Sequence, residues 1–291
     1  MPVETDRTEP PGQHGGNALV AVLRVLGALP LGVLRAVGAV LGLAVYLVSP
    51  GYRRKLRANL RTAGYLSVAD ALRAAAEAGR MVGELPYVWS RSPFELARHV
   101  VCDDLDVLDA AEAGGGGILF LAPHLGAFDV AARYYANRAP ITVLFKPPRQ
   151  AWLRPVVAFS RNTPSMRAVA ANVAGVRALL RALRAGEAVG LLPDQVPDAG
   201  EGCWAPFFGK PAWTMTLPLR LAGQRGIRVV LAVGERLPGS RGWRVHLETM
   251  DEAPTPEALN ARMEVLIRRF PAQYLWGYNR YKRPAAAGPR A

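Results

Sequence analysis

The sequence predicts an α/β fold in which a mostly parallel central sheet is flanked by helices, with an N-terminal membrane helix in front of it. The sheet is indicated by three short apolar runs, at residues 118–122, 141–145 and 188–192, which have the length and bulk of strands buried on both faces. Stretches with helical periodicity separate these runs, and this alternation is typical of a parallel sheet with helices on both faces. The membrane helix is indicated by a long apolar stretch at residues 18–49.

The first fifty residues divide into a tail and an anchor. Residues 1–17 are rich in Pro, Gly and polar side chains and are expected to be a disordered tail. Residues 18–50 are expected to be the membrane-anchoring helix, and residues 31–48 alone would span about 27 Å as a helix, just enough to cross the hydrocarbon core. A spanning helix and an amphipathic helix lying in the interface both fit, and a buried hairpin of two core helices is a third possibility.

A cluster of cations directly after the apolar stretch predicts its orientation. The cluster consists of Arg53, Arg54, Lys55, Arg57 and Arg61, and the first acidic residue after the apolar stretch is Asp70. Cytoplasmic flanks of membrane segments carry an excess of Lys and Arg, so the C-terminal side of the anchor is expected in the cytoplasm. The bulk of the protein should then lie at the cytoplasmic face of an inner membrane.

The remaining elements follow from periodicity. Helices are predicted at residues 68–91, 128–137, 150–160, 173–184, 214–226 and 256–270. Residues 227–233 and 243–249 read as two further strands, and the Pro238-Gly239 turn between them predicts a hairpin. With a short tail expected at residues 284–291, the main domain is predicted to cover residues 51–283.

Composition narrows the class of partner. The 291 residues carry a net charge of +13, and the isoelectric point is near 10.4, so the partner should be anionic: nucleic acid, an anionic membrane or a phosphorylated substrate. Zinc-ligand spacing, aromatic ribonucleoprotein motifs and basic heptads are missing from the sequence, which makes nucleic acid the weakest of the three. Cys102 and Cys203 occur in unrelated contexts and are expected to be reduced.

The residues after the first apolar run are the candidate catalytic residues. His124 follows the predicted strand, and Asp129 comes five residues later, at the start of the helix predicted at residues 128–137. On one regular helix the two side chains would point about 140° apart, so they can meet only if His124 lies on the loop. A carboxylate on one ring nitrogen would leave the other free as an oriented general base. The alternative is a surface loop followed by an ordinary carboxylate at a helix N-terminus.

The stretch His124-Leu-Gly-Ala-Phe-Asp129 resembles the H-x4-D box of the lysophospholipid acyltransferase superfamily. The flanking sequence resembles one branch, the late acyltransferases of lipid A biosynthesis. Three further stretches match this branch in order: Ala188-Val-Gly-Leu-Leu-Pro-Asp194-Gln195, Trp204-Ala-Pro-Phe-Phe-Gly-Lys-Pro211 and Gln273-Tyr-Leu-Trp-Gly-Tyr-Asn-Arg-Tyr-Lys-Arg283. The resemblance covers residues from about 20 to 283 and implies a glycerol-phosphate-acyltransferase-like fold. Ala127 stands where many members carry Asn.

The resemblance implies transfer of a fatty acyl chain from acyl carrier protein to a hydroxyl of a lipid A precursor of the Kdo-lipid IVA type. His124 would deprotonate the hydroxyl and Asp129 would hold the imidazole, with neither metal nor organic cofactor. Transfer to another glycolipid or a lysophospholipid is an alternative within the superfamily. The alternative from another class is a non-catalytic basic protein that binds anionic lipid at the membrane.

Ten cations and no acid lie between Asp129 and Glu187, namely Arg133, Arg138, Lys146, Arg149, Arg154, Arg161, Arg167, Arg177, Arg181 and Arg184. Such a segment could hold acceptor phosphates, lipid headgroups or an acidic carrier protein, although a run of cations is often only a solvated face. Relatives carry an active-site arginine near this point, and Arg161 and Arg167 both fall where it would lie. These two, with Lys146 and Arg149, are the candidates for binding the oxyanion or the acceptor phosphates.

Two further groups of candidates come from the matched stretches. Asp194 and Gln195 follow the third strand, where binding crevices form in open α/β sheets, and the resemblance assigns them to the acceptor site. The alternative is that Asp194 only satisfies a proline-flanked turn. Trp204, Phe207 and Phe208 are expected to wall the acyl pocket, or else to pack a loop against the core.

Overall fold

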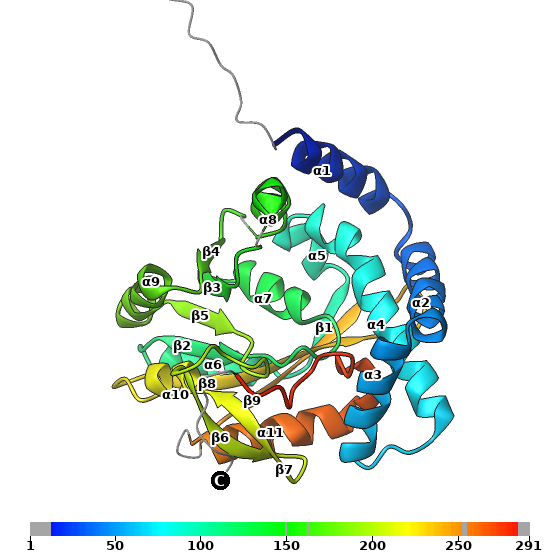
Figure 1. Ribbon diagram of the computed structural model, residues 1–291. Coiled ribbons are helices and arrows are strands. Elements are labelled where there is room, and N and C mark those ends of the chain that lie inside the picture. The colour runs from blue at the N-terminus through cyan, green and yellow to red at the C-terminus, as the bar shows by residue number, and fades with distance from the viewer. Residues whose placement is uncertain (1–12, 149, 162, 252–254, 285–291) are drawn as a thin grey trace, which may run out of the picture.

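The computed structural model of the chain describes residues 13–148, 150–161, 163–251 and 255–284 (Figure 1). The predicted α/β class is confirmed, with a mostly parallel sheet and helices on both of its faces. Residues 1–12 of the expected N-terminal tail and 285–291 of the expected C-terminal tail lie outside the described residues. Helix α1 begins at Gln13, inside the segment expected to be a tail.

Seven strands form the main sheet in the order β1-β9-β8-β2-β5-β3-β4. Every neighbouring pair is parallel except β8 and β9, which form the predicted antiparallel hairpin. The strands are β1 (Val100–Cys102), β2 (Ile118–Leu121), β3 (Ile141–Phe145), β4 (Met166–Ala170), β5 (Ala188–Leu191), β8 (Arg228–Arg236) and β9 (Trp243–Thr249). A separate antiparallel hairpin pairs β6 (Gly202–Phe207) with β7 (Lys210–Met215).

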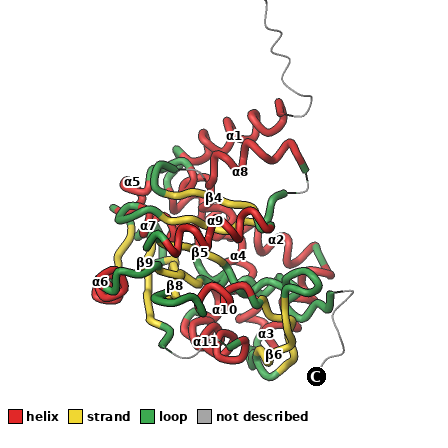
Figure 2. The backbone as a smooth tube through the Cα atoms, turned by 90° about the vertical axis from the view of Figure 1, so that its left-hand side faces the viewer, coloured by secondary structure: helices red, strands yellow, loops and turns green. Residues whose placement is uncertain are grey.

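Helices lie on both sides of these strands (Figure 2). They are α1 (Gln13–Gly27), α2 (Leu31–Val48), α3 (Pro50–Thr62), α4 (Val68–Trp89), α5 (Pro93–Ala97), α6 (Leu105–Ala113), α7 (Phe128–Ala136), α8 (Arg154–Arg161), α9 (Val173–Arg184), α10 (Leu217–Ala222) and α11 (Pro256–Arg269), with short 3-10 turns η1 (Ala151–Leu153) and η2 (Pro271–Gln273). Successive side chains of a strand point to opposite faces, so each central strand contributes to two cores. Ile118 and Phe120 pack under α6 and α7, whereas Leu119 and Leu121 pack on the side of α9, α10 and α11.

Several features of the fold differ from the sequence-based expectation. Strand β4 and the β6–β7 hairpin were not predicted. The helix expected at residues 214–226 is shorter, because Thr214 belongs to β7 and α10 begins at Leu217. Strand β1 was not predicted either.

Helix α2 coincides with the apolar segment predicted at residues 31–48. Among the described residues it is the one helix long and apolar enough to cross a membrane, judged by length and composition, and a third of it is buried against the rest of the protein. It packs along α4 with the two backbones in contact. Gly38 and Gly42 of α2 face Gly79 and Gly83 of α4, and a Cβ atom added at Gly79 would lie 2.0 Å from the carbonyl oxygen of Gly38. We call this contact the glycine seam.

A buried ion-pair cluster joins the same two helices to the β8–β9 hairpin. The Arg35 guanidinium of α2 donates to Glu84 of α4 at 2.9 Å and to backbone carbonyls of the hairpin turn at 2.9–3.0 Å. Arg236 at the end of β8 donates to Glu84 at 2.9 Å and to Glu77 at 2.6 Å. Arg35, Glu84 and Arg236 are all buried, so α2 is held to the domain by charge pairing as well as by close packing.

Candidate active site

The candidate site lies at the carboxyl ends of β2 and β5. These strands are parallel neighbours in a register that pairs Leu121 with Leu191. His124 comes three residues after Leu121, and Asp194 three residues after Leu191, so the two chains leave the sheet in step. Because the carboxyl ends of parallel strands meet at one edge of a sheet, this register brings two side chains 70 residues apart into contact.

Three hydrogen bonds fix the His124 ring and its backbone. Nδ1 lies 2.7 Å from Oδ1 of Asp194, and the His124 backbone N–H donates to Oδ2 of the same carboxylate at 3.0 Å. The amide nitrogen of Gln195 lies 3.0 Å from Nε2. An ionised carboxylate can only accept and an amide NH₂ can only donate, so the pairing selects the neutral tautomer with the proton on Nδ1 and a lone pair on Nε2. His124 and Gln195 both line a large cleft.

The carboxylate on Nδ1 is therefore Asp194 and not Asp129, the residue that the sequence favoured. Asp129 lies in the first turn of α7, is 8% exposed, and accepts a hydrogen bond of 2.7 Å from the indole N–H of Trp89 on α4. The sequence argument considered a local partner only. The partner of His124 follows another strand, and the register of β2 and β5 is the signal that identifies it.

Asp194 is almost fully enclosed, with 2% of its surface exposed. Burial alone raises the pKa of its carboxyl group, but the charge and hydrogen bonds of His124 and the charge of Arg280 outweigh burial and lower the pKa below the usual range. The pKa of the Tyr274 hydroxyl is raised by burial and by the Asp194 charge. Asp194 is thus ionised and Tyr274 is a neutral phenol at neutral pH.

The loop that carries His124 is held by two other parts of the chain. Gly126 has a φ of +61° and donates its N–H to the carbonyl of Gln273 at 3.0 Å. A Cβ at this position would lie 2.1 Å from the carbonyl of Gly234 on β8, so only glycine fits. Ala127 donates to that same carbonyl, and Leu275 donates to the carbonyl of His124 at 3.1 Å. The loop backbone is therefore fixed between β8 and the C-terminal segment.

The cleft in front of His124 is broad, with about 2490 Å³ of empty space including its open mouth. Its wall includes Trp89 of α4, Phe128 of α7 and residues of α8, of the loop after β5 and of the C-terminal segment. Among the side chains that the structure describes, three cations line it: Lys146, Lys282 and Arg283. Lys146 was predicted as an anion-binding residue, and it pairs with Asp198 at 3.4 Å where both side chains are largely exposed.

The other predicted cations have different positions. Arg167 is exposed on the edge strand β4 and is not part of the cleft wall. Arg149 lies outside the described residues. Arg161 ends α8, next to Ser160 of the cleft wall, but its side chain is outside the described part of the structure. Lys282 and Arg283 were not among the predicted site residues, although the alternation of aromatic residues and cations at 274–283 was a signal for an anion-binding surface.

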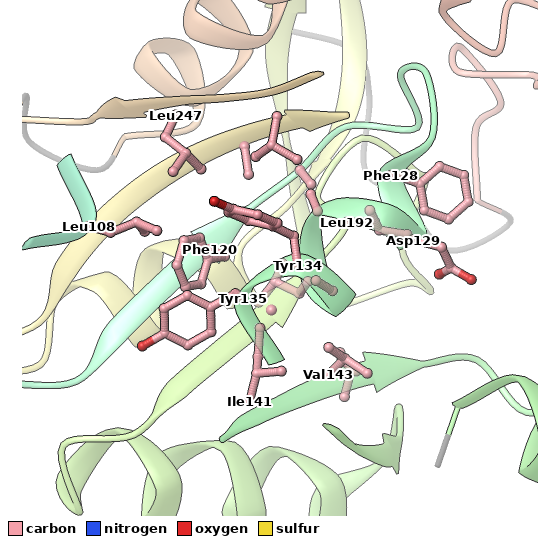
Figure 3. Close-up of a pocket in the computed structure, with 18 residues that line it drawn as sticks. Leu108, Phe120, Phe128, Asp129, Tyr134, Tyr135, Ile141, Val143, Leu192 and Leu247 are labelled. Carbon is pink, nitrogen blue, oxygen red and sulfur yellow. The ribbon is translucent and has the colours of Figure 1, made fainter. Parts of the chain in front are cut away.

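A second, apolar cavity lies beside α7 and shares Phe128, Leu144, Leu191 and Leu192 with the cleft. Its free interior volume is about 50 Å³, well below the roughly 300–1,000 Å³ of small-molecule pockets. Figure 3 shows Phe128 and Asp129 at one end of this cavity and Leu108 and Tyr135 at the other. Its walls are the α7 side chains and the face of the sheet that α7 covers.

The aromatic residues predicted for an acyl pocket lie elsewhere. Trp204 stacks edge-on against Trp213 within the β6–β7 hairpin, with ring centroids 5.3 Å apart. Phe207 and Phe208 are buried on the opposite side of the sheet from α7, in the core that contains Tyr274 and Trp276. None of the three lines the cleft or the cavity. They correspond to the alternative interpretation, a turn packed against the core.

Within the described residues, no three His, Cys, Asp or Glu side chains come together as a group that could hold a metal ion. Residues 9–283, nearly the whole chain, match a family model described as bacterial lipid A biosynthesis acyltransferase. A search of curated proteins found none that matches the chain.

Proposed function

The chain belongs to the bacterial lipid A biosynthesis acyltransferase family, and we propose that it moves a fatty acyl chain from acyl carrier protein to a hydroxyl of a Kdo-lipid IVA-type lipid A precursor. The family is an acyltransferase family, which implies an acyl donor and a lipid acceptor. The observation that carries the proposal is the His124 ring, whose Nε2 lone pair lies at the cleft wall while Asp194 holds Nδ1. This is the arrangement of a general base.

In the proposed reaction, Nε2 of His124 takes the proton of the acceptor hydroxyl as the oxygen attacks the thioester carbonyl. The carbon–sulfur bond of the resulting tetrahedral intermediate then breaks, and the imidazolium returns the proton to the departing thiolate. Asp194 stabilises the imidazolium by accepting a hydrogen bond from Nδ1 and by its negative charge. Asp194 therefore takes the role that the sequence-based prediction gave to Asp129. We assign to Asp129 the positioning of the first turn of α7 through Trp89.

The acceptor should enter through the cleft. Lys146 and Lys282 are exposed there. Their ammonium groups can bind the phosphate and carboxylate groups of the acceptor. We retain Arg161, at the end of α8, as the residue that stabilises the oxyanion, because the neighbouring Ser160 is part of the cleft wall. Gln195 donates to Nε2 in the free protein, so the acceptor hydroxyl must displace this amide to reach the base.

The acyl chain should enter the apolar cavity beside α7 instead of a site at Trp204, Phe207 or Phe208, and the side chains that line this cavity must move apart to admit it, since its free volume is about 50 Å³. The cavity begins at Phe128, whose ring centroid lies 4.9 Å from that of His124, and it is enclosed mainly by aliphatic and aromatic side chains. A chain in this position would place its carbonyl beside the imidazole. Each buried methylene contributes about 0.8 kcal/mol, so the depth of the cavity would set the preferred chain length.

The acidic carrier protein should meet a group of exposed cations. Arg177, Arg181 and Arg184 are exposed along α9, whose first residue follows closely on Ala171 of the cleft wall. Electrostatic attraction of this kind raises association rates and falls steeply with salt. The proposed docking face is therefore the outer side of α9.

We place the protein at the cytoplasmic face of the inner membrane, with α2 lying along the bilayer surface. The outward side of α1 and α2 exposes large apolar residues, including Val25, Val37, Val40, Leu41 and Val48. The other side of α2 is attached to α4 by the glycine seam and by Arg35. Helix α4 carries Asp70, Arg73, Glu77, Arg80 and Glu84, so a helix bound along it cannot cross the hydrocarbon core without taking these charges along.

The first experiment is acyl transfer from labelled acyl carrier protein to the tetraacylated Kdo-lipid A precursor, with the full chain in detergent. Three proteins are compared: the intact chain, His124→Ala and His246→Ala. His246 is the matched control, because its ring pairs with Glu235 on β8 at 2.9 Å, away from the cleft. Removing a general base should cost about 10²–10⁴-fold in rate, so His124→Ala should lose transfer and His246→Ala should keep it.

Other results would redirect the proposal. If the intact protein transfers no acyl group of any chain length to this precursor but acylates another glycolipid or a lysophospholipid, the acceptor assignment is wrong. A protein that binds anionic lipid equally well with and without His124, and transfers nothing to any acceptor, would be the non-catalytic lipid-binding alternative.

A further inference from the structure

The Gln195 side chain lies directly on the free ring nitrogen of the candidate base. Its amide nitrogen is 3.0 Å from Nε2 of His124, and the amide donates to Nε2 because Asp194 already holds the proton of the ring at Nδ1. The Nε2 lone pair is the group that would take a proton from the acceptor. In the free protein this lone pair is therefore occupied.

The backbone on both sides of Gln195 is fixed. The Asp194 carboxylate before it accepts from the backbone N–H of His124 at 3.0 Å and contacts the ring at 2.7 Å. Val196 after it donates its backbone N–H to the Tyr278 hydroxyl at 2.9 Å. Gln195 itself is half-buried and forms part of the wall of the broad cleft. Rotation of this one side chain can therefore uncover Nε2 without movement of the loop.

The cleft would otherwise bring water to the base. Its free interior volume is about 1040 Å³, which has room for many water molecules, and the His124 side chain is 13% exposed. A general base that takes a proton from a lipid hydroxyl can also take one from water. The water oxygen would then attack the thioester carbonyl, the carbon–sulfur bond would break, and the imidazolium would return the proton to the thiolate. The products would be a free fatty acid and a free thiol.

An amide is chemically suited to prevent this side reaction. Its NH₂ group donates hydrogen bonds, but it does not give up a proton to a neutral imidazole. A Ser or Thr hydroxyl in the same place could itself be deprotonated and react with the thioester. The Gln195 amide therefore occupies the base without becoming an acceptor of the acyl group.

We propose that Gln195 selects the acceptor, because its amide covers Nε2 against water and gives way to the hydroxyl of a bound lipid. The inference deepens the proposed function and rests on the general-base role of His124. An acceptor whose anionic groups are held by Lys146 and Lys282 presents its hydroxyl at the ring, and water has no such anchor. A hydrogen bond of ordinary net strength shifts an equilibrium roughly 2–10-fold, so the amide should suppress hydrolysis by about this factor.

The test measures release of labelled fatty acid by the full chain in detergent, without lipid acceptor. Labelled acyl carrier protein is the first donor, and the coenzyme A thioester of the same acyl chain is the second. The proteins compared are the intact chain, Gln195→Ala, Gln195→Met and Gln224→Ala. Methionine keeps most of the bulk of glutamine but cannot donate a hydrogen bond.

Gln224→Ala is the matched control. The Gln224 side chain donates to the carbonyl of Arg220 at 3.3 Å, between α10 and β8. Because β8 runs parallel to β2, this residue precedes the sheet at the end opposite to His124. Its replacement removes the same amide far from the cleft and should leave the release of fatty acid as it is in the intact chain.

Both Gln195 variants should release about 2–10 times more fatty acid than the intact chain. Adding His124→Ala to Gln195→Ala should abolish this increase, since the released acid depends on the base. When the tetraacylated Kdo-lipid A precursor is added, a larger fraction of the donor should end as free fatty acid in Gln195→Ala than in the intact chain.

Three results would overturn the proposal. The first is equal hydrolysis by the intact chain and both Gln195 variants. The second is an increase in Gln195→Ala but not in Gln195→Met, which would mean that bulk and not the hydrogen bond excludes water. The third is a loss of about 10²–10³-fold in both hydrolysis and transfer, which is the effect of removing an oxyanion donor.

The hydrolysis assay needs no lipid, so the two proposals can fail separately. Transfer by the intact chain without extra hydrolysis in the Gln195 variants would keep the proposed function and reject the role of Gln195. Extra hydrolysis that depends on His124, combined with no transfer to the lipid A precursor, would support the role of Gln195 and reject the assigned acceptor.

Discussion

The charge of Asp194 depends on the fold, because its two strongest partners come from distant parts of the chain. His124 is 70 residues away, and Arg280 comes from the segment after α11. In the unfolded chain this carboxyl group would titrate near 3.9. The folded structure lowers its pKa through His124 and Arg280 despite burial. Folding and proton release at Asp194 are therefore linked.

The sign of this linkage gives a prediction for acid stability. A carboxyl group whose pKa is lower in the folded state stabilises the fold above its unfolded pKa, and the contribution is lost as the pH falls through the folded pKa. We expect the melting temperature of the intact protein to fall more steeply between about pH 5 and pH 3 than that of Asp194→Asn.

Asp103→Asn is the control for this measurement. The Asp103 carboxylate is largely exposed and pairs with Arg244 at 3.5 Å. Its replacement should leave the slope of melting temperature against pH close to that of the intact protein, since a screened surface pair contributes little. A slope for Asp194→Asn that equals that of the intact protein would contradict the linkage.

The candidate base could be predicted from the sequence, but its partner could not. A glycine run, an apolar strand and His124 form a local pattern that a single stretch of sequence contains. The contact with Asp194 depends on which strands are neighbours and in which register, and neither is encoded within any short window. Asp194 itself was identified as a candidate, because residues just after a strand lie at the edge where binding crevices form.

At the scale of elements, the glycine seam is the contact that attaches α2 to the domain. Replacing Gly79 by Leu puts a side chain where the backbones of α2 and α4 touch, and the carbonyl of Gly38 would lie 2.0 Å from the new Cβ. We expect this variant to be destabilised by about 1–3 kcal/mol, the usual cost of overpacking. The free energy of unfolding in urea would measure it.

Gly51→Ala serves as the matched control for the seam. Gly51 lies in the first turn of α3, and a Cβ there meets no atom within 4 Å. Alanine is favoured over glycine in helices, so this variant should be as stable as the intact protein or slightly more stable. Equal stability of Gly79→Leu and Gly51→Ala would mean that α2 is not held at the seam.

Helix α7 forms the wall of the cavity assigned to the acyl chain, so its small residues should set chain length. Ala132→Leu adds three carbons to the cavity wall, and we expect it to shift the preferred donor to a shorter chain. The measurement offers donors of several chain lengths together and analyses the products by mass spectrometry. Ala178→Leu on α9 makes the same change on a helix that does not line the cavity, and it should keep the original preference.

The unpredicted elements have identifiable reasons. The β6–β7 hairpin turns through Phe208 and Gly209, both with positive φ, at 48° and 72°. Such two-residue turns usually carry Asn-Gly or Asp-Gly, and Phe-Gly does not have that signature. The hairpin strands also contain Pro206 and Pro211, which argue against a strand. Strand β4 is at the edge of the sheet and pairs with β3 alone, and the exposed Arg167 interrupts its apolar residues, so it lacks the continuous apolar run of a strand buried on both faces.

At the scale of the whole molecule, an exposed apolar surface on the first two helices is followed in the chain by exposed cations. Apolar residues of α1 and α2 are exposed on one side, and the cations Arg54, Lys55 and Arg61 of α3 follow directly. The sequence predicted both the apolar segment and the cations. It could not distinguish a spanning helix from one lying on the surface, and it could not show that Glu84 pairs with Arg35 of this helix from 49 residues away.

The orientation of α2 can be tested in cells with a cysteine placed at Ala28, in the turn between α1 and α2, after Cys102 and Cys203 are changed to Ser. If α2 lies along the cytoplasmic surface, a membrane-impermeant thiol reagent should label Cys at this position only after the inner membrane is permeabilised. A spanning α2 would put the turn outside and allow labelling of intact spheroplasts. A second cysteine at Ala199, on the exposed loop after β5, gives the cytoplasmic control.

The Arg35 cluster also sets an order of events during synthesis. The carbonyls that accept from Arg35 come from the hairpin turn, and Gly242 is 207 residues further along the chain. At about 5–20 residues per second, a ribosome needs roughly 10–40 s to produce that turn after Arg35 has been made. During this interval α2 has already left the ribosome with its apolar side exposed and its arginine without these acceptors. We therefore expect the first helices of the nascent chain to stay on a membrane surface or a chaperone until the last strand of the sheet is synthesised.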